Sequence, residues 1–453
     1  MNIYLHLELS ARELDSKLLL ATLAAEKGHN VIISNMREIM SGLRAGVFPP
    51  GIFHTKSLTP SKSKINRHQE IIDKNFIITS IDEESGVIQH SYDQFAIDRY
   101  SERTIEQSSA VFCWGSEDTE TLKKKYSRNS DKIMKTGSPR VDLWQSFFSE
   151  YWTPPKKIPQ KPFLLVSSNM HCNNMVNFHD FIKFHKDAGY FERDPNLFKN
   201  FFNMISEDYR KLYSFIDAIR FLAQNNEEFD IVLRPHPIEN IKAWEIFLDG
   251  LPNVHIIRED SISTWVKHSF AVMHNGCTTA VEASISGKPV LTFNPFEMKY
   301  GNELTNSLGY FITSKEQLRI KANEILNLNK ISSQQEVKTK ISQTILRKLY
   351  IDPEELSAKK ILKVWESFDD KKYSEPINLK KFYLLKMNPK KYAKWLFVKL
   401  FPKLIFNKEN YKFPPFEKKN IILKLIRLQN ILGIGNKLEC KLLSEQTLLI
   451  KKL

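Results

Sequence analysis

The sequence is most constrained by a regular alternation of short apolar, β-branched runs with longer helical patterns, which occurs twice along the chain. Between the first two runs, residues 13–27 carry leucines at helical spacing, and Gly28 follows as a helix stop. Strands separated by helices of this length predict βαβ units and a parallel sheet. Residues 1–152 are therefore predicted to form a Rossmann-like domain. Its strands are expected at residues 2–9, 31–34, 76–81, 110–114 and 133–136.

A proline-rich polar segment at residues 153–162 interrupts this pattern and has the composition of an interdomain linker. The alternation resumes over residues 163–350, which predicts a second Rossmann-like domain. Its strands are expected at residues 163–168, 229–234, 254–257, 270–274 and 289–293. Residues 351–370 are expected to form a closing helix that packs back toward the first domain. The predicted fold class is α/β, with two Rossmann-like domains facing one cleft and a basic, mostly helical C-terminal segment.

The basic charge of the chain is concentrated in residues 371–453. This segment holds 20 Lys and Arg against 5 Asp and Glu, which gives +15, whereas the whole chain carries +14. Its lysines alternate with Phe, Tyr, Trp and Leu, a pattern typical of a segment that lies on an anionic membrane surface. A lysine-coated helical subdomain is the alternative interpretation. No nucleic-acid partner is expected, because no recognisable RNA or DNA module accompanies the charge.

Cysteine usage and the N-terminus indicate where the protein is expected to work. The four cysteines lie far apart with no CxxC pair, so neither a disulfide framework nor a metal site is predicted. The N-terminus has the pattern of a first strand and not of a signal peptide, and no apolar run approaches the roughly 18 residues of a membrane span. We expect a cytoplasmic protein that is peripheral on the inner face of the cytoplasmic membrane.

Polar residues that follow predicted strands of the second domain are candidates for ligand binding, because α/β folds bind ligands at the carboxyl ends of their strands. Arg234, His236 and Pro237 end one strand, where a cation, an imidazole and a rigid turn suit a phosphate. His236 capping a turn is the structural alternative. Ser167, Ser168 and His171 follow the first strand of this domain and are placed to contact a donor or an acceptor.

A second motif of this domain consists of a strand, a turn of small residues and a helix. Asn275, Gly276, Thr278 and Thr279 stand where backbone amides and two hydroxyls hold an anion. One of the two threonines serving only as a helix N-cap is the alternative. Glu282, one turn into the helix, is expected either to reach a ribose hydroxyl or to lie solvated.

In the first domain, Asp82, Glu83 and Glu84 follow a predicted strand and offer a general base, because burial and neighbours tune a carboxylate toward neutrality. A solvated acidic loop is the alternative. Glu8 and Arg12 follow the first strand, where they either bind an acceptor or form an ion pair. A capping box of Ser10 and Glu13 is equally consistent with that sequence.

These residues together resemble the GT-B-fold glycosyltransferases of bacterial surface polysaccharide synthesis, among them proteins named surface carbohydrate biosynthesis proteins. The resemblance spans residues 1–368 and is carried by the segments RPHP, NGCTTAVEASISGKPVLTF and DEESG. Within this group the chain looks most like sialyltransferase-like and Kdo-transferase-like enzymes, which use CMP-sugars. In such enzymes an acidic-acidic-Gly motif supplies the base, a His-Pro motif contacts the CMP phosphate, and a Ser/Thr pair binds the phosphate or the sugar carboxylate.

Carried over to this sequence, the resemblance implies that His236 and Pro237 contact the phosphate and that Thr278 and Thr279 are the hydroxyl pair. The acidic motif departs from the pattern, since Ser85 separates Glu84 from Gly86. Glu83 is slightly favoured as the base, with Asp82 and Glu84 left open.

The expected function is transfer of an acidic sugar from its CMP-activated donor onto a bacterial surface glycan. The sugar would be Kdo or a nonulosonic acid such as pseudaminic or sialic acid, and the acceptor a glycan or lipid-linked glycan. His, Arg and amide groups would stabilise the CMP leaving group without a metal or other cofactor. A transferase of UDP-sugars or of polyol phosphates is the alternative among enzymes, and a non-catalytic scaffold of a glycan assembly complex is the alternative outside them.

Overall fold

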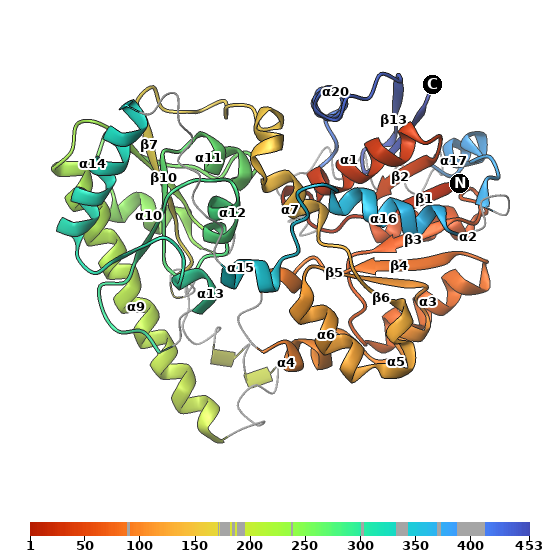
Figure 1. Cartoon of the computed structure of the whole chain (residues 1–453), viewed down its shortest axis with the longest axis horizontal. Helices are drawn as coiled ribbons and strands as arrows, with labels where there is room; N and C mark the ends of the chain where they lie inside the picture. The colour runs from red at the N-terminus through yellow and green to blue at the C-terminus, as the bar shows by residue number, and fades with distance from the viewer. Residues whose placement is uncertain are drawn as a thin grey trace. The chain divides into compact units, whose positions relative to one another are not determined.

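A computed structural model of the chain describes two compact units (Figure 1). Unit 1 consists of Met1–Leu143 and Leu346–Leu453, and unit 2 of Trp144–Ile345. The first boundary therefore precedes the predicted linker, which belongs to unit 2. The described residues are 1–87, 91–170, 172, 182–183, 186–187, 195–236, 239–299, 303–331, 343–368, 373–386 and 413–453.

Unit 1 is built on an eight-stranded sheet with the order β13-β14-β2-β1-β3-β4-β5-β6, in which β1 to β6 run parallel. The strands are β1 (Asn2–His6), β2 (Asn30–Ser34), β3 (Ile52–Thr55), β4 (Ile77–Ile81), β5 (Ala110–Cys113), β6 (Ile133–Lys135), β13 (Leu438–Ser444) and β14 (Thr447–Lys452). The helices are α1 (Ser10–Glu26), α2 (Met36–Arg44), α3 (Lys62–Asp73), α4 (Tyr92–Arg99), α5 (Glu102–Glu106), α6 (Ser116–Lys125), α7 (Pro139–Trp144), α15 (Gln343–Lys348), α16 (Ser357–Glu366), α17 (Leu379–Lys386) and α20 (Lys418–Leu432), of which α7 and α15 reach across the unit boundaries.

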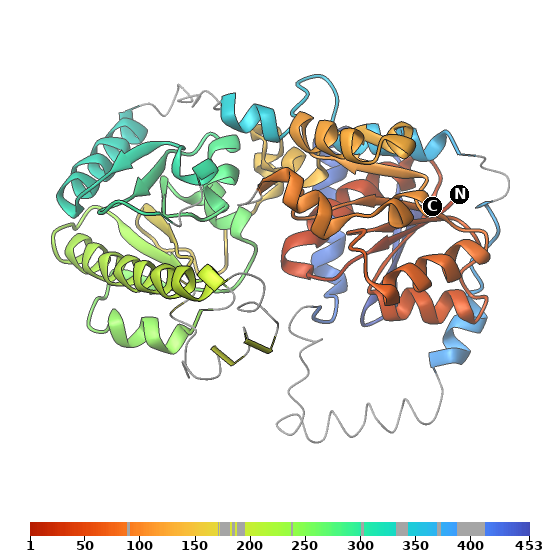
Figure 2. The same cartoon turned by 90° about the horizontal axis from the view of Figure 1, so that it is seen from below.

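Unit 2 is built on a six-stranded parallel sheet with the order β12-β11-β10-β7-β8-β9. Its strands are β7 (Phe163–Ser167), β8 (Asp230–Arg234), β9 (Val254–Ile256), β10 (Ala271–His274), β11 (Val290–Phe293) and β12 (Tyr310–Ile312). Its helices are α9 (Pro195–Gln224), α10 (Ile241–Phe247), α11 (Ile262–His268), α12 (Thr279–Ile285), α13 (Glu303–Asn306) and α14 (Lys315–Ile331). Figures 1 and 2 show α9, the longest of these, beside α14 along this sheet.

The predicted α/β class is confirmed, since each unit is a mainly parallel sheet covered by helices. Alternate strand residues supply the cores: in unit 1, Tyr4, Ile32, Phe53 and Ile78 pack with the apolar face of α2. In unit 2, β-strand residues such as Leu164 pack with α9, α10 and α14. Two short strands, β3 and β12, were not predicted from the sequence.

The prediction of a separate, mostly helical C-terminal segment is wrong, because these residues belong to unit 1 and end in two strands. β14 pairs antiparallel with β2, with Leu448 opposite Ile33, and β13 pairs with β14. The hairpin covers β2, which would otherwise be an exposed edge strand open to other chains. The described part of the basic segment predicted to lie on a membrane thus belongs to unit 1, and its last two strands extend the unit 1 sheet, while residues 387–412 lie outside the described part. Among the described residues, no helix combines the length and the apolar character that crossing a bilayer requires.

After the chain returns to unit 1, the start of α16 is capped by a residue that is distant in sequence. The amides of Ser357 and Ala358 at the start of α16 donate to the Asp142 carboxylate at 3.0 and 2.9 Å. Gly137, with φ +80°, lies so close to Ser357 and the Tyr350 carbonyl that a Cβ there would clash. Residues 137–142 therefore form the surface on which Tyr350 and the start of α16 pack.

Replacing Asp142 by alanine is expected to lower the free energy of unfolding by about 1–2 kcal/mol, because two helix-terminal amides lose their acceptor. The difference is measured by urea unfolding at neutral pH. Asp131→Ala, which removes an exposed aspartate of the same unit, is the control and should change stability by less than about 0.5 kcal/mol. Equal stabilities of the two variants would contradict the capping role.

Candidate functional site

The predicted donor-binding residues of unit 2 follow β7, β8 and β10, which are neighbours in its sheet. Arg234 ends β8 and donates to the carbonyl of Asp260 at 2.9 Å and to that of Glu259. Its guanidinium also lies 5.7 Å from the ring centroid of Trp265, and burial lowers its pKa to about 10. These contacts tie Arg234 to the segment after β9, so the side chain positions this loop whether or not it also reaches a phosphate.

A buried carboxylate that the sequence analysis missed, Glu239, organises the ends of β7 and β8. It is 2% exposed and accepts hydrogen bonds from the Ser168 hydroxyl at 3.0 Å and from the amides of Met170 and His236, both at 3.1 Å. The indole of Trp244 on α10 donates to it at 2.7 Å. Burial raises the pKa of Glu239, and these donors counteract the shift.

His236 is held by its backbone on two sides. Its amide donates to Glu239, and its carbonyl accepts from the Arg258 guanidinium at 3.0 Å. The imidazole is therefore carried on a fixed backbone position directly after β8, which is the placement that the predicted phosphate contact requires. Pro237 and His171, two further predicted site residues, lie outside the described residues.

The structure brings Ser167 and Thr279 together, as expected for residues at one edge of a parallel sheet. The Ser167 hydroxyl lies 3.1 Å from the Thr279 hydroxyl and 3.1 Å from the Cys277 sulfur. The sulfur in turn lies 3.2 Å from Thr279. This cluster of three small polar side chains joins the end of β7 to the start of α12. Ser168, by contrast, is committed to Glu239.

Asn275 and Gly276 form the tight turn after β10. Asn275 is 1% exposed and its side-chain amide donates to the Phe293 carbonyl at 2.7 Å. Its side-chain oxygen has no hydrogen-bond partner among the described residues. Gly276 adopts φ +73°, and its amide donates to the Asn306 side chain at 2.8 Å. The turn is thus rigid and requires glycine, and its amide is already occupied.

The structure excludes a capping role for the Thr278 side chain and a solvated position for Glu282. Thr278 stands at the N-cap position of α12 in an α-helical conformation, and its side chain makes no capping hydrogen bond. Its hydroxyl is exposed and does not cap the helix, so its predicted ligand role stays open. Glu282 is 4% exposed, which excludes the solvated alternative.

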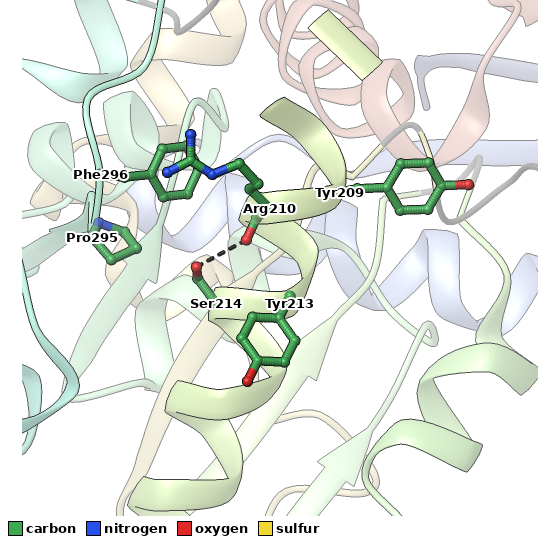
Figure 3. Close-up of a pocket in the computed structure, with 6 residues that line it drawn as sticks. All are labelled: Tyr209, Arg210, Tyr213, Ser214, Pro295 and Phe296. Carbon is green, nitrogen blue, oxygen red and sulfur yellow. Dashed lines mark hydrogen bonds between the residues drawn. The ribbon is translucent and has the colours of Figure 1, made fainter. Parts of the chain in front are cut away.

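An open pocket of about 480 Å³ lies in unit 2 between α9 and the segment after β11 (Figure 3). It is lined by Tyr209, Arg210, Tyr213, Ser214, Pro295 and Phe296. The Arg210 guanidinium lies 4.1 Å from the ring centroid of Phe296, and Ser214 donates to the Arg210 carbonyl at 2.9 Å. Tyrosine rings at such a pocket, 48% and 71% exposed at Tyr209 and Tyr213, offer flat surfaces on which a sugar or a base can stack.

In unit 1 the three candidate acids after β4 have three different environments. Asp82 is fully buried and both its oxygens accept from Arg99, at 2.8 and 3.0 Å. Burial raises its pKa, although Arg99 counteracts the shift. A carboxylate with no exposed surface and both oxygens paired is poorly placed to receive a proton from a substrate.

Glu83 forms a buried ion pair with Lys17 of α1. The Lys17 nitrogen lies 2.8 Å from a Glu83 oxygen, and the two side chains are only 1% and 4% exposed. Burial by itself would raise the pKa of Glu83, but the charges of Lys17 and Arg140 lower it below its usual value. Glu83 is thus a structural anion in this structure.

Glu84 is the exposed member of the three. Its side chain is 47% exposed, with one oxygen 3.2 Å from Arg12 and the other 3.4 Å from Arg99. Two guanidinium groups orient this carboxylate while solvent reaches it. The acidic loop is therefore neither wholly solvated nor wholly buried.

Packing beneath the acidic loop explains the last two residues of the DEESG segment. The Ser85 hydroxyl donates to Asp118 at 2.7 Å, and the same carboxylate accepts from the Trp114 and Gly115 amides. A Cβ on Gly86 would lie 2.1 Å from the Trp114 ring. Gly86 is therefore required by close packing, and Ser85 anchors the loop to the start of α6.

Glu8 and Arg12, the predicted acceptor residues after β1, both form ion pairs. Glu8 pairs with Lys56, and Arg12 pairs with Glu13 at 3.0 Å as well as with Glu84. The Glu13 carboxylate also accepts from the Glu8 amide at 2.9 Å. The capping-box alternative is wrong, because the N-cap of α1 is Leu9 and no side chain caps it.

Neither a protein-family model nor a curated protein matches the sequence. Solved structures do show similarity. A UDP-GlcNAc 2-epimerase from Methanocaldococcus jannaschii is 13% identical, with 81% of this chain and 99% of that chain covered and a TM-score of 0.48. A glycosyltransferase from Rickettsia africae is 12% identical over 81% and 97%, with a TM-score of 0.44. The wall teichoic acid polymerase TagF is 14% identical over 70% and 72%, with a TM-score of 0.42.

At these identities the similarity concerns the fold alone. Within the described ranges, no group of three or more His, Cys, Asp and Glu side chains is arranged to hold a metal ion.

Proposed function

We propose that the protein is a glycosyltransferase that uses a nucleotide-activated sugar in the synthesis of a bacterial surface glycan. The observation that carries the proposal is the carboxyl edge of the unit 2 sheet, where buried contacts hold His236 after β8 and Asn275 and Thr279 after β10, with β7 between these two strands. This edge would bind the donor, and the aromatic pocket beside β11 offers a surface for its sugar. Unit 1 would bind the acceptor.

The finer part of the proposal is a CMP-activated acidic sugar as the donor, on the strength of the sequence resemblance alone. In the reaction an acceptor hydroxyl attacks the anomeric carbon, the bond from that carbon to the CMP phosphate breaks, and the phosphate leaves with the electron pair. His236 would donate a hydrogen bond to the departing phosphate, which stabilises the charge that develops on it. A carboxylate would take the proton of the hydroxyl.

Glu84 is proposed as that carboxylate in place of Glu83, which was slightly favoured from the sequence. Glu84 is the exposed acid of the three, whereas Glu83 and Asp82 are buried in ion pairs. Arg12 and Arg99 would keep Glu84 ionised and oriented, and an acceptor hydroxyl can approach its exposed oxygens.

A nucleotide screen tests the donor. Because a ligand that binds only the folded state raises the melting temperature, purified protein should melt higher with CMP than with UMP, UDP, GDP or ADP. His236→Ala should retain its fold, lose most of this response and lower turnover by about 10² or more. A selective response to UDP would keep a nucleotide-sugar transferase and discard the CMP donor. No response to any nucleotide would favour a non-catalytic scaffold.

Two matched substitutions test the base. Glu84→Gln should lower kcat by about 10² to 10⁴ with little change in stability, because an exposed carboxylate is replaced by an amide of the same shape. Glu83→Gln should instead lower the free energy of unfolding by about 3–5 kcal/mol, because it leaves the buried Lys17 without its counter-charge. Activity assays and urea unfolding on both variants separate the two roles. Normal turnover in Glu84→Gln would remove this residue from the site.

We also propose that unit 1 associates with an anionic membrane surface near its C-terminal hairpin. α17 exposes Tyr383 and Leu384, at 46% and 69%, beside two lysines, and α20 exposes Leu423 and Ile426, at 43% and 46%. Phe382 of α17 belongs to the same buried cluster as Leu443 of β13 and Leu449 of β14, while α20 packs on β13 and α1. Exposed apolar side chains next to lysines such as Lys380, Lys381, Lys418 and Lys419 suit anionic lipid headgroups.

Co-sedimentation with vesicles of phosphatidylglycerol and phosphatidylcholine tests this surface. The double variant Leu423→Ser, Ile426→Ser should bind several-fold more weakly than wild type, because two apolar side chains no longer enter the lipid interface. Ile320→Ser, Leu328→Ser, which changes two somewhat more exposed apolar residues on α14 of unit 2, is the control and should bind like wild type. Wild-type protein that stays in the supernatant at low salt would contradict the association.

A further inference from the structure

We propose that the carboxyl edge of the unit 1 sheet contains a site for an oxyanion, formed by Lys64 and Arg67 of α3 together with Ser57 of the loop before it. The anion would be a phosphate or carboxylate group. The proposal rests on the function proposed above in that the anion would belong to the acceptor substrate. The site itself stands on the contacts of α3.

Several charges at this edge form ion pairs, whereas Lys64 and Arg67 do not in the part of the chain that the structure describes. Lys17 pairs with Glu83, Lys56 with Glu8, and Arg99 with Asp82. Among the described residues, Lys64 has no carboxylate partner: its ammonium group donates to the Ser57 hydroxyl at 2.8 Å and to the Ser57 carbonyl at 3.4 Å. Arg67 forms neither a hydrogen bond nor an ion pair within the described part of the chain. Lys64 and Arg67 are thus two neighbouring cations on one helix without a carboxylate of the described ranges bound to either.

Lys64 also stands in surroundings that disfavour its charge. It is partly buried, and burial together with nearby Lys56 lowers its pKa to about 8. Arg67 lies one turn further along the same helix face, close enough to lower that pKa as well. Like charges at this spacing destabilise a helix by themselves. An oxyanion between the two cations would reduce the repulsion and stabilise the charged form of Lys64.

The start of α3 also lacks the acidic residues that a helix N-terminus favours. Its first turn holds Lys62 and Lys64 and no acidic residue, although the positive end of the helix dipole favours acids there. The helix amides are not the site, because Ser61 already caps them by accepting from the Lys64 amide at 3.3 Å. A chain that keeps cations where local physics disfavours them is expected to use them.

One further group supports a ligand at this place. His68, one turn from Lys64, is fully buried, and both its ring nitrogens lack hydrogen-bond partners among the described residues. Burial, Lys64 and Arg67 lower its pKa to about 4, so the ring is neutral and carries one N–H donor. A buried imidazole without partners is costly, and it adds polar capacity beside the two cations.

The donor set defines the class of ligand. A lysine ammonium, the planar fork of an arginine and a serine hydroxyl together match the oxygens of a phosphate or a carboxylate. Such a site would select acceptors that carry an anionic group near the hydroxyl that reacts. It would also disfavour neutral glycans, which leave the two cations unpaired.

Titration calorimetry on the full chain at low salt tests the site with three probes: inorganic phosphate, glycerol phosphate and acetate. Low salt is needed because partly exposed charges are screened. We expect saturable binding of at least one probe to the wild-type protein. Lys64→Met and Arg67→Met should each bind that probe about tenfold more weakly or worse, since each loses a charge-assisted hydrogen bond. Lys64→Arg should retain binding. Lys74→Met, which removes an exposed lysine at the far end of α3, is the control and should bind like wild type.

The ranking of the probes identifies the source of the anion. Preference for glycerol phosphate over inorganic phosphate indicates a phosphoryl group on a substrate, preference for inorganic phosphate indicates a free ion, and preference for acetate indicates a sugar carboxylate. No saturable binding of any probe, or equal affinities in Lys64→Met and Lys74→Met with both variants folded, would overturn the site. Nucleotide binding is measured on the same protein. If nucleotides bind and the anions do not, only the anion site is overturned. If the anions bind and no nucleotide does, only the proposed function is overturned.

Discussion

The ion pair between Lys17 and Glu83 determines how the loop after β4 meets solvent. Both charges are almost completely removed from water, so each depends on the other. The pair fastens α1 to the acidic loop, and Arg99 fastens Asp82 in the same way on the other side. With two of three consecutive acids held inward, Glu84 is the carboxylate left facing outward. The chemistry proposed for unit 1 therefore depends on an interaction that takes no part in it.

In unit 2 a buried carboxylate without an ion-pair partner among the described residues orders the ends of two strands. This carboxylate is Glu239, and donors from the segments after β7 and β8 and from α10 surround it instead. Hydrogen bonds from backbone amides are directional, so they fix the segments that carry them more tightly than a flexible lysine would. His236 owes its position to this carboxylate. In both units a buried acid orders the edge at which the proposed ligand-binding residues stand.

The sequence was sufficient for the α/β class and for most strands, because buried parallel strands are continuous apolar runs that local pattern reveals. It failed for β3, half of which is the polar pair His54 and Thr55, and for β12, in which two of three residues are exposed. It also failed for the C-terminal hairpin, whose lysines and leucines resemble an amphipathic helix. The acidic loop and the His236 and Thr279 turns were found because they follow strands directly. Their partners were not: Lys17 is distant in sequence from Glu83, and Glu239 alone looks like a solvated acid. Long-range pairing decides which polar residue is buried, and no local pattern records it.

The order of the unit 1 sheet connects the two proposed surfaces of that unit. From β13, next to the helices proposed to face a membrane, to β4, which precedes Glu84, the sheet runs β13-β14-β2-β1-β3-β4. Five interstrand steps of about 4.8 Å place these strands roughly 24 Å apart. A hydrogen-bonded sheet holds that spacing rigidly. An acceptor carried on a lipid would then need a linking portion long enough to cover such a distance, and an anionic group in that portion is what the unmatched cations of α3, between β3 and β4, would receive.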